Sequence, residues 1–270
     1  MTMKYVKLAF LPILFLFIAF LYTTCSKDGD ANFFTLQDDI TLGQQLSEQI
    51  AADPETYPVL SETSYSEAYD FLGNMVDEIL NSGEVLHREE FAWSFKIIQN
   101  DTVLNAFAAP GGYIYVYTGL IKYLDDASQL AGVLGHEIAH ADLRHSSERL
   151  TKAYGIEVLL NLILGQNNES LLIDIAEQLT FLAFSRTDEK ESDTQSVIYL
   201  ANTIYDARGA AGFFEKLSEA GEGSSPGTFL HTHPDPDDRV ANIHAKFEEI
   251  GSPAGGTFEE EYQAFKNDLP

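Results

Sequence analysis

The chain has 270 residues, of which 45% are hydrophobic and 21% charged, and these proportions are ordinary for a folded globular protein. Its 16 Lys and Arg residues stand against 42 Asp and Glu residues, which gives a formal net charge of -26. The electric field of such a negative charge repels the phosphates of nucleic acids and anionic lipid headgroups, so we expect no nucleic acid as a partner.

The first residues have the pattern of a bacterial export signal. Two lysines precede an apolar run over 8–22, which is short for a bilayer-spanning helix but typical of a signal-peptide core. The run leads to Cys25, the only cysteine in the chain, through a sequence that loosely resembles a lipobox. We predict a lipoprotein signal peptide over 1–24, lipidation of Cys25 and a polar tether over 25–32. The protein would then be lipid-anchored in the cell envelope of a bacterium, facing the periplasm or the outer surface. The alternative is an incidental thiol behind an uncleaved anchor.

Hydrophobic periodicity predicts the elements of the remaining chain, which we divide into a catalytic domain over 33–250 and a C-terminal tail over 251–270. The predicted helices cover 36–50, 65–80, 125 or 126 to about 145, 156–164, 171–184 and 189–206. The predicted strands cover 91–99 and 113–117, and the second is entered through a Pro-Gly-Gly turn. Because the strands lie in the N-terminal half and helices dominate the C-terminal half, we predict an α+β fold.

The pattern His-Glu-x-x-His at 136–140 is the decisive motif. Residues four apart share a helix face, so His136 and His140 can offer imidazole nitrogens to one Zn²⁺, while Glu137 can take a proton from metal-bound water. The alternative is a chance spacing on an amphipathic helix. The neighbouring residues are apolar, however, and unliganded histidines are costly in a core. The motif therefore predicts one zinc ion per chain.

A catalytic zinc site needs a third protein ligand. In the HExxHxxGxxH class the glycine and the third histidine would fall at 143 and 146, but Leu143 and Ser146 occupy those positions and exclude that class. His145 lies on a different helical face from His140, and we predict that it is an exposed histidine at the helix end. A carboxylate from a later helix is then the expected ligand, and the segment 185–193 offers several.

These segments together resemble metallopeptidase family 48. The HExxH motif is followed some fifty residues later by a Ser-Arg-x-x-Glu-x-Glu-x-Asp segment at 185–193. The segment 105–120 is similar to the family's strand and turn beside the cleft, and 232–239 is similar to its late Thr-His-Pro-x-x-x-x-Arg element. The resemblance spans about residues 33 to 247. It implies a mostly helical zincin-type (gluzincin) domain with a small β-sheet beside the active-site helix.

By that resemblance Glu189 is the third zinc ligand, and Asp193 orients a metal-bound histidine. The spacing agrees, because residues 189 and 193 share a helix face whereas Glu191 points elsewhere. We interpret Asp188 and Glu191 as part of a solvated helix face. One departure from the family pattern is Ser192, where members usually carry Ala, and we expect it to be tolerated because Ser is nearly as small.

The resemblance also implies roles for two late residues. His233 resembles a histidine that can occupy the fourth zinc position in a resting, self-inhibited state, and Arg239 resembles an arginine that faces the developing oxyanion. The alternative for His233 is an ordinary residue of a proline-turned loop.

The expected substrate-binding element is an edge strand, to which an extended peptide adds by backbone hydrogen bonds with limited sequence preference. It is formed by Asn105, Ala106, Phe107 and Ala108.

The implied function is a zinc-dependent endopeptidase that hydrolyses unfolded or damaged cell-envelope proteins. Its partners would be unfolded or misfolded polypeptides, and the membrane through the lipid on Cys25. The alternative is a non-catalytic, holdase-like lipoprotein, but a binding protein does not need the general base Glu137. A polytopic prenyl protease is disfavoured, because after residue 22 no apolar stretch approaches the ~18 to 20 residues that span a bilayer.

Overall fold

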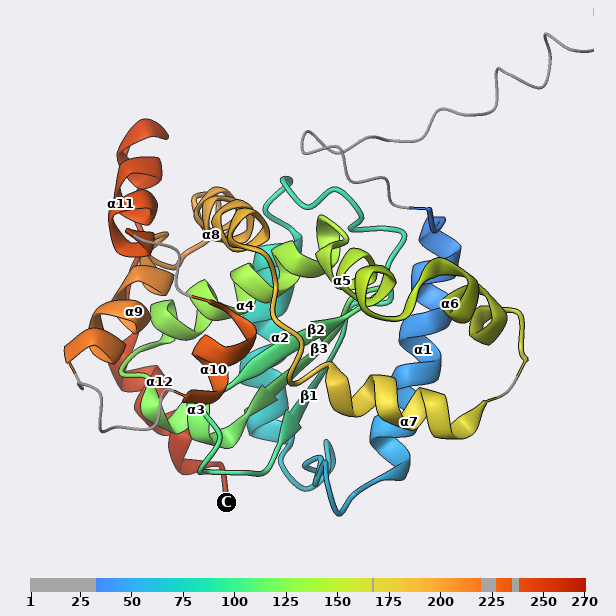
Figure 1. Ribbon diagram of the computed structural model, residues 1–270. Helices are drawn as coiled ribbons and strands as arrows, with labels where there is room; N and C mark the ends of the chain where they lie inside the picture. Colours follow the sequence, from blue (N-terminus) through green and yellow to red (C-terminus); the bar gives the residue numbers. More distant parts are fainter. Residues whose placement is uncertain (1–32, 167, 220–226, 235–237) are drawn as a thin grey trace, which may run out of the picture. The chain divides into compact units, whose positions relative to one another are not determined.

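The computed structural model describes residues 33–166, 168–219, 227–234 and 238–270 (Figure 1). The predicted signal peptide, Cys25 and the tether lie outside the described residues. In chain order the elements are α1 (Leu36–Ala52), α2 (Ser66–Leu80), β1 (Ser94–Ile98), β2 (Ala106–Ala109), β3 (Tyr113–Tyr117), α3 (Thr118–Tyr123), α4 (Ala127–Asp142), α5 (His145–Tyr154), α6 (Ile156–Ile163), α7 (Glu169–Gln178), α8 (Arg186–Leu200), α9 (Gly209–Glu219), α10 (Gly227–Thr232), α11 (Arg239–Glu249) and α12 (Glu259–Asn267).

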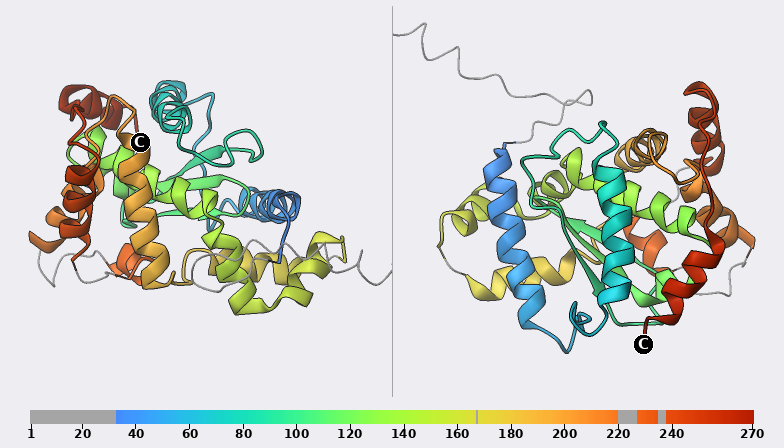
Figure 2. Two further views of the ribbon diagram at one scale, coloured as in Figure 1. Left: turned by 90° about the horizontal axis from the view of Figure 1, so that it is seen from above. Right: turned by 180° about the vertical axis from the view of Figure 1, so that it is seen from behind.

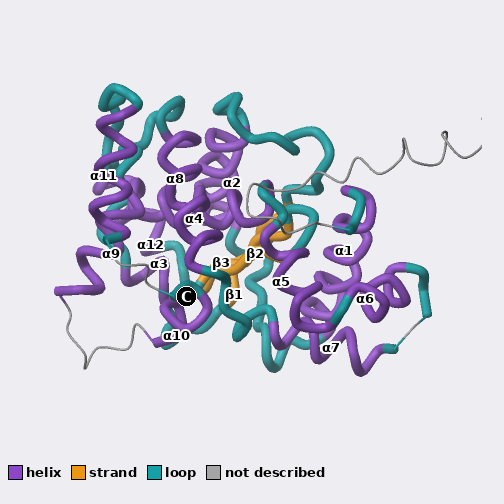
Figure 3. Tube along the Cα trace, turned by 45° about the horizontal axis from the view of Figure 1, so that its top comes forward, coloured by secondary structure: helices purple, strands orange, loops and turns teal. Residues whose placement is uncertain are grey.

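The three strands form one small sheet in the order β1-β3-β2, and helices surround it (Figure 3). β1 runs parallel to β3, whereas β2 is antiparallel to β3 and forms an edge. The predicted turn joins β2 to β3, and Gly111 adopts a φ of 75° there, a left-handed conformation that glycine reaches without strain. The structure therefore confirms the α+β class, with helix predominating.

The two faces of the sheet carry separate parts of the core, because alternate strand residues point to opposite sides. Phe107, Tyr115 and Tyr117 pack in a cluster with buried residues of α1, α6 and α7. Ala106, Ala108 and other residues of the opposite face pack in a second cluster with α2 and α4. The sheet thus lies between the N-terminal helix and the helix that carries the HExxH motif.

The position of α4 is fixed by close approaches to its neighbours β2, α8 and α9. Its N-terminus is capped by Asp126, whose side chain accepts a hydrogen bond from the backbone N–H of Gln129. A Cβ at Gly132 would lie 2.0 Å from the backbone nitrogen of Ala210, so only glycine allows α9 to approach α4 this closely. The HExxH helix is therefore held in the middle of the unit.

Helix ends differ from the prediction at one important place. The helix predicted to reach about His145 ends at Asp142, because Arg144 adopts a left-handed conformation with a φ of 66°. The side chain of Arg144 donates to Asp39 Oδ2 (2.6 Å) and to the carbonyl oxygen of Phe34 (2.5 Å). These contacts with the start of the folded chain hold the break, and a new helix, α5, begins at His145.

The segment 251–270, predicted to be a tail, packs into the core instead. Tyr262 and Phe265 of α12 are buried, and the Phe265 ring stacks on Phe71 of α2 with 4.4 Å between centroids. The Tyr262 hydroxyl donates to the carbonyl oxygen of Ile121 (2.7 Å). α12 and α2 lie side by side in the view from behind (Figure 2). The folded unit therefore extends over residues 34–270.

No helix in the described ranges has both the length and the apolar character that crossing a bilayer requires.

Candidate metal centre

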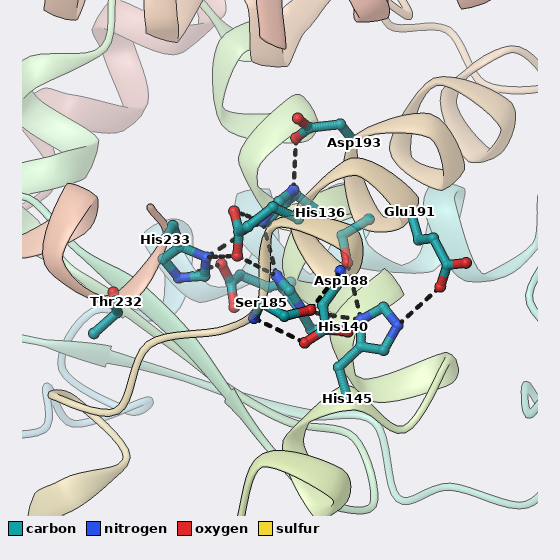
Figure 4. Close-up of polar contacts among 12 residues, drawn as sticks. His136, His140, His145, Ser185, Asp188, Glu191, Asp193, Thr232 and His233 are labelled. Atoms are coloured by element: carbon teal, nitrogen blue, oxygen red, sulfur yellow. Dashed lines mark hydrogen bonds and ion pairs between the residues drawn. The ribbon is translucent and has the colours of Figure 1, made fainter. Parts of the chain in front are cut away.

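Four buried side chains from three parts of the chain meet at one point (Figure 4). α4 contributes His136 and His140, α8 contributes Glu189, and His233 directly follows α10. Ser185 caps α8 in a reciprocal capping box, which fixes the start of that helix and places Glu189 in its first turn. One ligand atom from each of the four residues lies within 4.8 Å of all the others. This group contains the three predicted ligands and the predicted fourth position.

The ligand atoms lie 2.9–3.3 Å apart, at or slightly below the separations around a tetrahedral zinc ion. His136 Nε2 lies 2.9 Å from His140 Nε2 and 3.3 Å from His233 Nδ1. Glu189 Oε1 lies 3.3 Å from His140 Nε2 and 3.1 Å from His233 Nδ1. Ligands at the Zn–N and Zn–O distances of about 2.0–2.2 Å stand about 3.3–3.6 Å apart around a tetrahedral zinc ion. The donor set of three imidazoles and one carboxylate therefore suits zinc.

Glu137 is a buried carboxylate beside this cluster. The side chain is 0% exposed, and in the described part of the chain neither carboxylate oxygen has a hydrogen-bond partner. Its Oε1 lies 3.5 Å from His233 Nε2. Because a buried carboxylate without hydrogen bonds opposes folding, its presence here points to chemistry rather than to stability.

Asp193 and Arg239 form a charged layer behind the ligands. Asp193 Oδ1 lies 2.9 Å from His136 Nδ1, which is the contact predicted for a residue that orients a metal-bound histidine. Arg239 donates through Nε and Nη2 to both Asp193 oxygens (2.7 and 2.5 Å), and its Nη1 lies 3.0 Å from Glu189 Oε2. Arg239 thus contacts Asp193, which holds His136, and the candidate ligand Glu189, and its role at the oxyanion stays a prediction.

The charges in the cluster shift the pKa values of its members. Burial opposes protonation of His136, but hydrogen bonds with Asp193 and Glu189 outweigh it and raise the pKa to about 9. Burial and the neighbouring His136 hold the pKa of His140 well below its ordinary value. Burial alone would raise the pKa of Glu189, yet His233 and His136 hold it well below normal.

The prediction that His145 is exposed is wrong. The residue is 4% exposed, and its Nδ1 lies 3.1 Å from Nδ1 of His140. The prediction assumed one continuous helix through residue 145, whereas the break at Arg144 rotates His145 toward the cluster.

Two aromatic contacts of the cluster were not predicted. The Phe184 ring stacks on His140 with 3.7 Å between centroids, and Phe229 stacks on His233 at 4.4 Å. The guanidinium group of Arg149 also lies over the Phe184 ring, 3.8 Å from its centroid. These residues lie outside the HExxH helix and follow no periodic pattern, so only the three-dimensional arrangement identifies them.

β2 forms the edge strand that the sequence predicts, with bounds shifted by one residue. The N–H of Tyr117 donates to the carbonyl oxygen of Asn105. Because every second residue of an antiparallel strand bonds to its neighbour, the N–H and C=O groups of Ala106 and Ala108 point away from β3, toward the open edge of the sheet. The Ala108 carbonyl already accepts a hydrogen bond from Ser146 Oγ (2.8 Å). The amide group of Asn105 is buried, and within the described ranges it has no hydrogen-bond partner. Peptide binding at this edge stays a prediction.

Comparison with known proteins gives a consistent result. The family model of peptidase family M48 matches residues 71–246. The chain is 37% identical over 149 residues to mitochondrial metalloendopeptidase OMA1 of Arabidopsis thaliana, covering 55% of this chain and 30% of that protein. It is 28% identical over 222 residues to the beta-barrel assembly-enhancing protease of Yersinia pestis, covering 77% of this chain and 43% of that protein. The protease of the same name from Escherichia coli (strain K12) is 30% identical over 161 residues, covering 55% of this chain and 33% of that protein. The chain therefore spans less than half the length of these relatives.

Proposed function

The chain belongs to peptidase family M48, and we propose that it is a zinc-dependent endopeptidase that hydrolyses unfolded or damaged polypeptides in the cell envelope of a bacterium. The observation that carries this proposal is the convergence of His136, His140 and Glu189 beside Glu137, a buried carboxylate that has no hydrogen-bond partner among the described residues. Three ligands hold a catalytic zinc ion and leave one position for chemistry.

His136, His140 and Glu189 would hold the ion, with Asp193 fixing the ring of His136. When bound, zinc supplies a Lewis acid for the substrate carbonyl and lowers the pKa of a water molecule to about 7. Glu137 takes a proton from the attacking water and delivers it to the leaving amine. Among the described residues its carboxylate oxygens have no hydrogen-bond partner, so both are available to the attacking water.

His233 holds the centre in a resting state. Its Nδ1 lies 3.1 Å from Glu189 Oε1, and its Nε2 faces Glu137 at 3.5 Å. The same ring therefore fills the fourth position and contacts the general base. Because the side chains of the cluster are buried, substrate reaches them only after His233 moves away.

The envelope location rests on the predicted signal peptide and on bacterial relatives whose names refer to beta-barrel assembly. We propose lipid attachment at Cys25. A Cys25→Ser protein should resist signal-peptidase processing and lose incorporation of radioactive palmitate. Labelling that persists in this variant would remove the proposed anchor and leave the proposed peptidase chemistry untouched.

The peptidase proposal is tested by Glu137→Gln. The variant keeps the three ligands and should retain zinc, while cleavage of an unfolded protein such as reduced casein should fall about 10²- to 10⁴-fold or more. Zinc content and circular dichroism of both proteins provide the control. Equal cleavage by wild type and variant would contradict the proposal, and a wild-type protein that binds unfolded chains without cleaving them would favour the holdase alternative.

A further inference from the structure

We propose that His145 is a positioning residue of the metal centre, which accepts a hydrogen bond from His140 and is itself held by Glu191 and Ser192. This inference rests on the proposed metal site and adds a residue that neither the HExxH pattern nor the resemblance in the sequence assigns.

The geometry of His140 determines which nitrogen faces which partner. Its Nε2 faces the cluster, 2.9 Å from His136 Nε2 and 3.3 Å from Glu189 Oε1. Its Nδ1 points the other way and meets His145 Nδ1 at 3.1 Å. An imidazole that binds a metal through one nitrogen carries its proton on the other. His140 therefore donates, and His145 Nδ1 must accept.

The surroundings of His145 match this tautomer. If Nδ1 accepts, the proton of His145 is on Nε2, and that nitrogen lies 3.4 Å from the carboxylate oxygen Oε2 of Glu191 (Figure 4). The hydroxyl of Ser192 lies 3.2 Å from Nδ1 and packs beside the same nitrogen. Ser192 is the position at which the sequence departs from the usual Ala of the family pattern. The serine at this position places a hydroxyl group beside His145, the residue that we propose supports His140.

The two histidine ligands of α4 then have parallel supports from α8. Asp193 accepts from His136 directly, at 2.9 Å. Glu191 and Ser192 act on His140 through His145. Because His145 is 4% exposed, little water can replace its hydrogen bond to His140 if the ring is removed.

The test compares three substitutions of His145 in the purified full chain, with zinc affinity measured by competition with a chromophoric chelator. His145→Asn places its amide oxygen near the position of Nδ1 and can still accept the hydrogen bond. His145→Leu has similar volume and cannot accept it. His145→Gln remains polar but carries its amide one carbon further from the backbone. We expect zinc binding to weaken about 10- to 100-fold in the Leu and Gln variants, the usual loss when a support of a ligand is removed, and to stay near wild type in the Asn variant.

A matched control is His244→Leu on α11, where the histidine side chain is 42% exposed and outside the cluster. Its zinc affinity should not change. Urea unfolding of the metal-free proteins separates positioning from packing. If His145 were purely structural, its replacement would lower the free energy of unfolding and leave zinc affinity unchanged. If the Leu variant does not fold, the zinc affinities of the Gln and Asn variants are compared instead, and weaker binding by the Gln variant supports the inference.

Equal zinc affinity in wild type, Asn and Gln variants would overturn the inference and leave the proposed function standing. A wild-type protein that binds no zinc would instead overturn the metal site itself. Since the assay needs no turnover, the two failures are distinguishable.

Discussion

Two parts of the metal centre are built in different ways. His136, His140 and Glu189 lie on α4 and α8, helices of 16 and 15 residues that pack tightly against each other. His233 follows α10, a helix of only 6 residues. Its ring is held by stacking on Phe229, and the end of α10 is tied to the chain before α8 by a backbone hydrogen bond from Phe184 N–H to Thr232 (3.0 Å).

This difference in support indicates which of the four candidate ligands can move. Displacing His136, His140 or Glu189 requires rearrangement of the core, because α4 and α8 are joined by contacts such as the hydrogen bond from Tyr199 Oη to Asp142 Oδ2 (2.6 Å). Displacing His233 requires a shift of this short helix, with the loss of the Phe184–Thr232 backbone hydrogen bond and of the contact between the His233 and Phe184 rings. We therefore expect changes to the first group to abolish metal binding or folding, and changes to His233 to alter activity alone.

The largest expected effect is on metal binding by Glu189→Gln. The amide keeps the size of the ligand but removes its charge, so zinc affinity should fall on the order of 100-fold or more, beyond the loss typical of a residue behind the ligands. Chelator competition measures it, and Lys190→Gln, at the exposed position next to Glu189 in α8, is the control. Undiminished zinc in the Glu189 variant would transfer the ligand role to Glu191 or Asp188.

The second prediction tests the rigidity of α4. Gly132→Ala places a Cβ 2.0 Å from the Ala210 backbone nitrogen, so α9 must shift, and the free energy of unfolding should fall by about 1–3 kcal/mol or more. Gly73→Ala in α2 is the matched control, because the nearest atom is a Phe95 ring carbon at 3.3 Å and alanine favours the helix. Urea denaturation of both variants gives the values. Equal stability would mean that α9 moves easily and that α4 is not rigidly held.

The smallest effect is expected for His233→Ala. Removing the fourth ligand opens the position that chemistry needs, while three ligands remain, so cleavage of unfolded protein should rise several-fold at unchanged zinc content. His231→Ala, an exposed histidine of α10, is the control. A fall in activity with zinc still bound would instead place His233 beside Arg239 in stabilising the transition state.

The centre of the site could be predicted in part from local patterns. The HExxH spacing places His136 and His140 on one face of a helix, with Glu137 beside them. The family resemblance, and not the spacing alone, selected Glu189 among the carboxylates of 185–193, and the structure brings this residue to the two histidines.

Features that depend on distant parts of the chain were missed. The break before α5 arises from contacts of Arg144 with Asp39, more than a hundred residues earlier, and it alone turns His145 inward. α12 was taken for a tail because its few apolar residues, among them Tyr262 and Phe265, become informative only when their partner α2 is known. Tertiary contacts, not local propensity, decide both cases.

The central claim is that His136, His140 and Glu189 form a zinc site that His233 closes. X-ray absorption at the zinc edge tests it most directly, applied to the wild-type protein and to His233→Ala. We predict one zinc ion per chain with nitrogen and oxygen ligands at about 2.0–2.2 Å, three imidazoles in the wild type and two in the variant. An absence of bound zinc, or the same number of imidazoles in both proteins, would contradict the account.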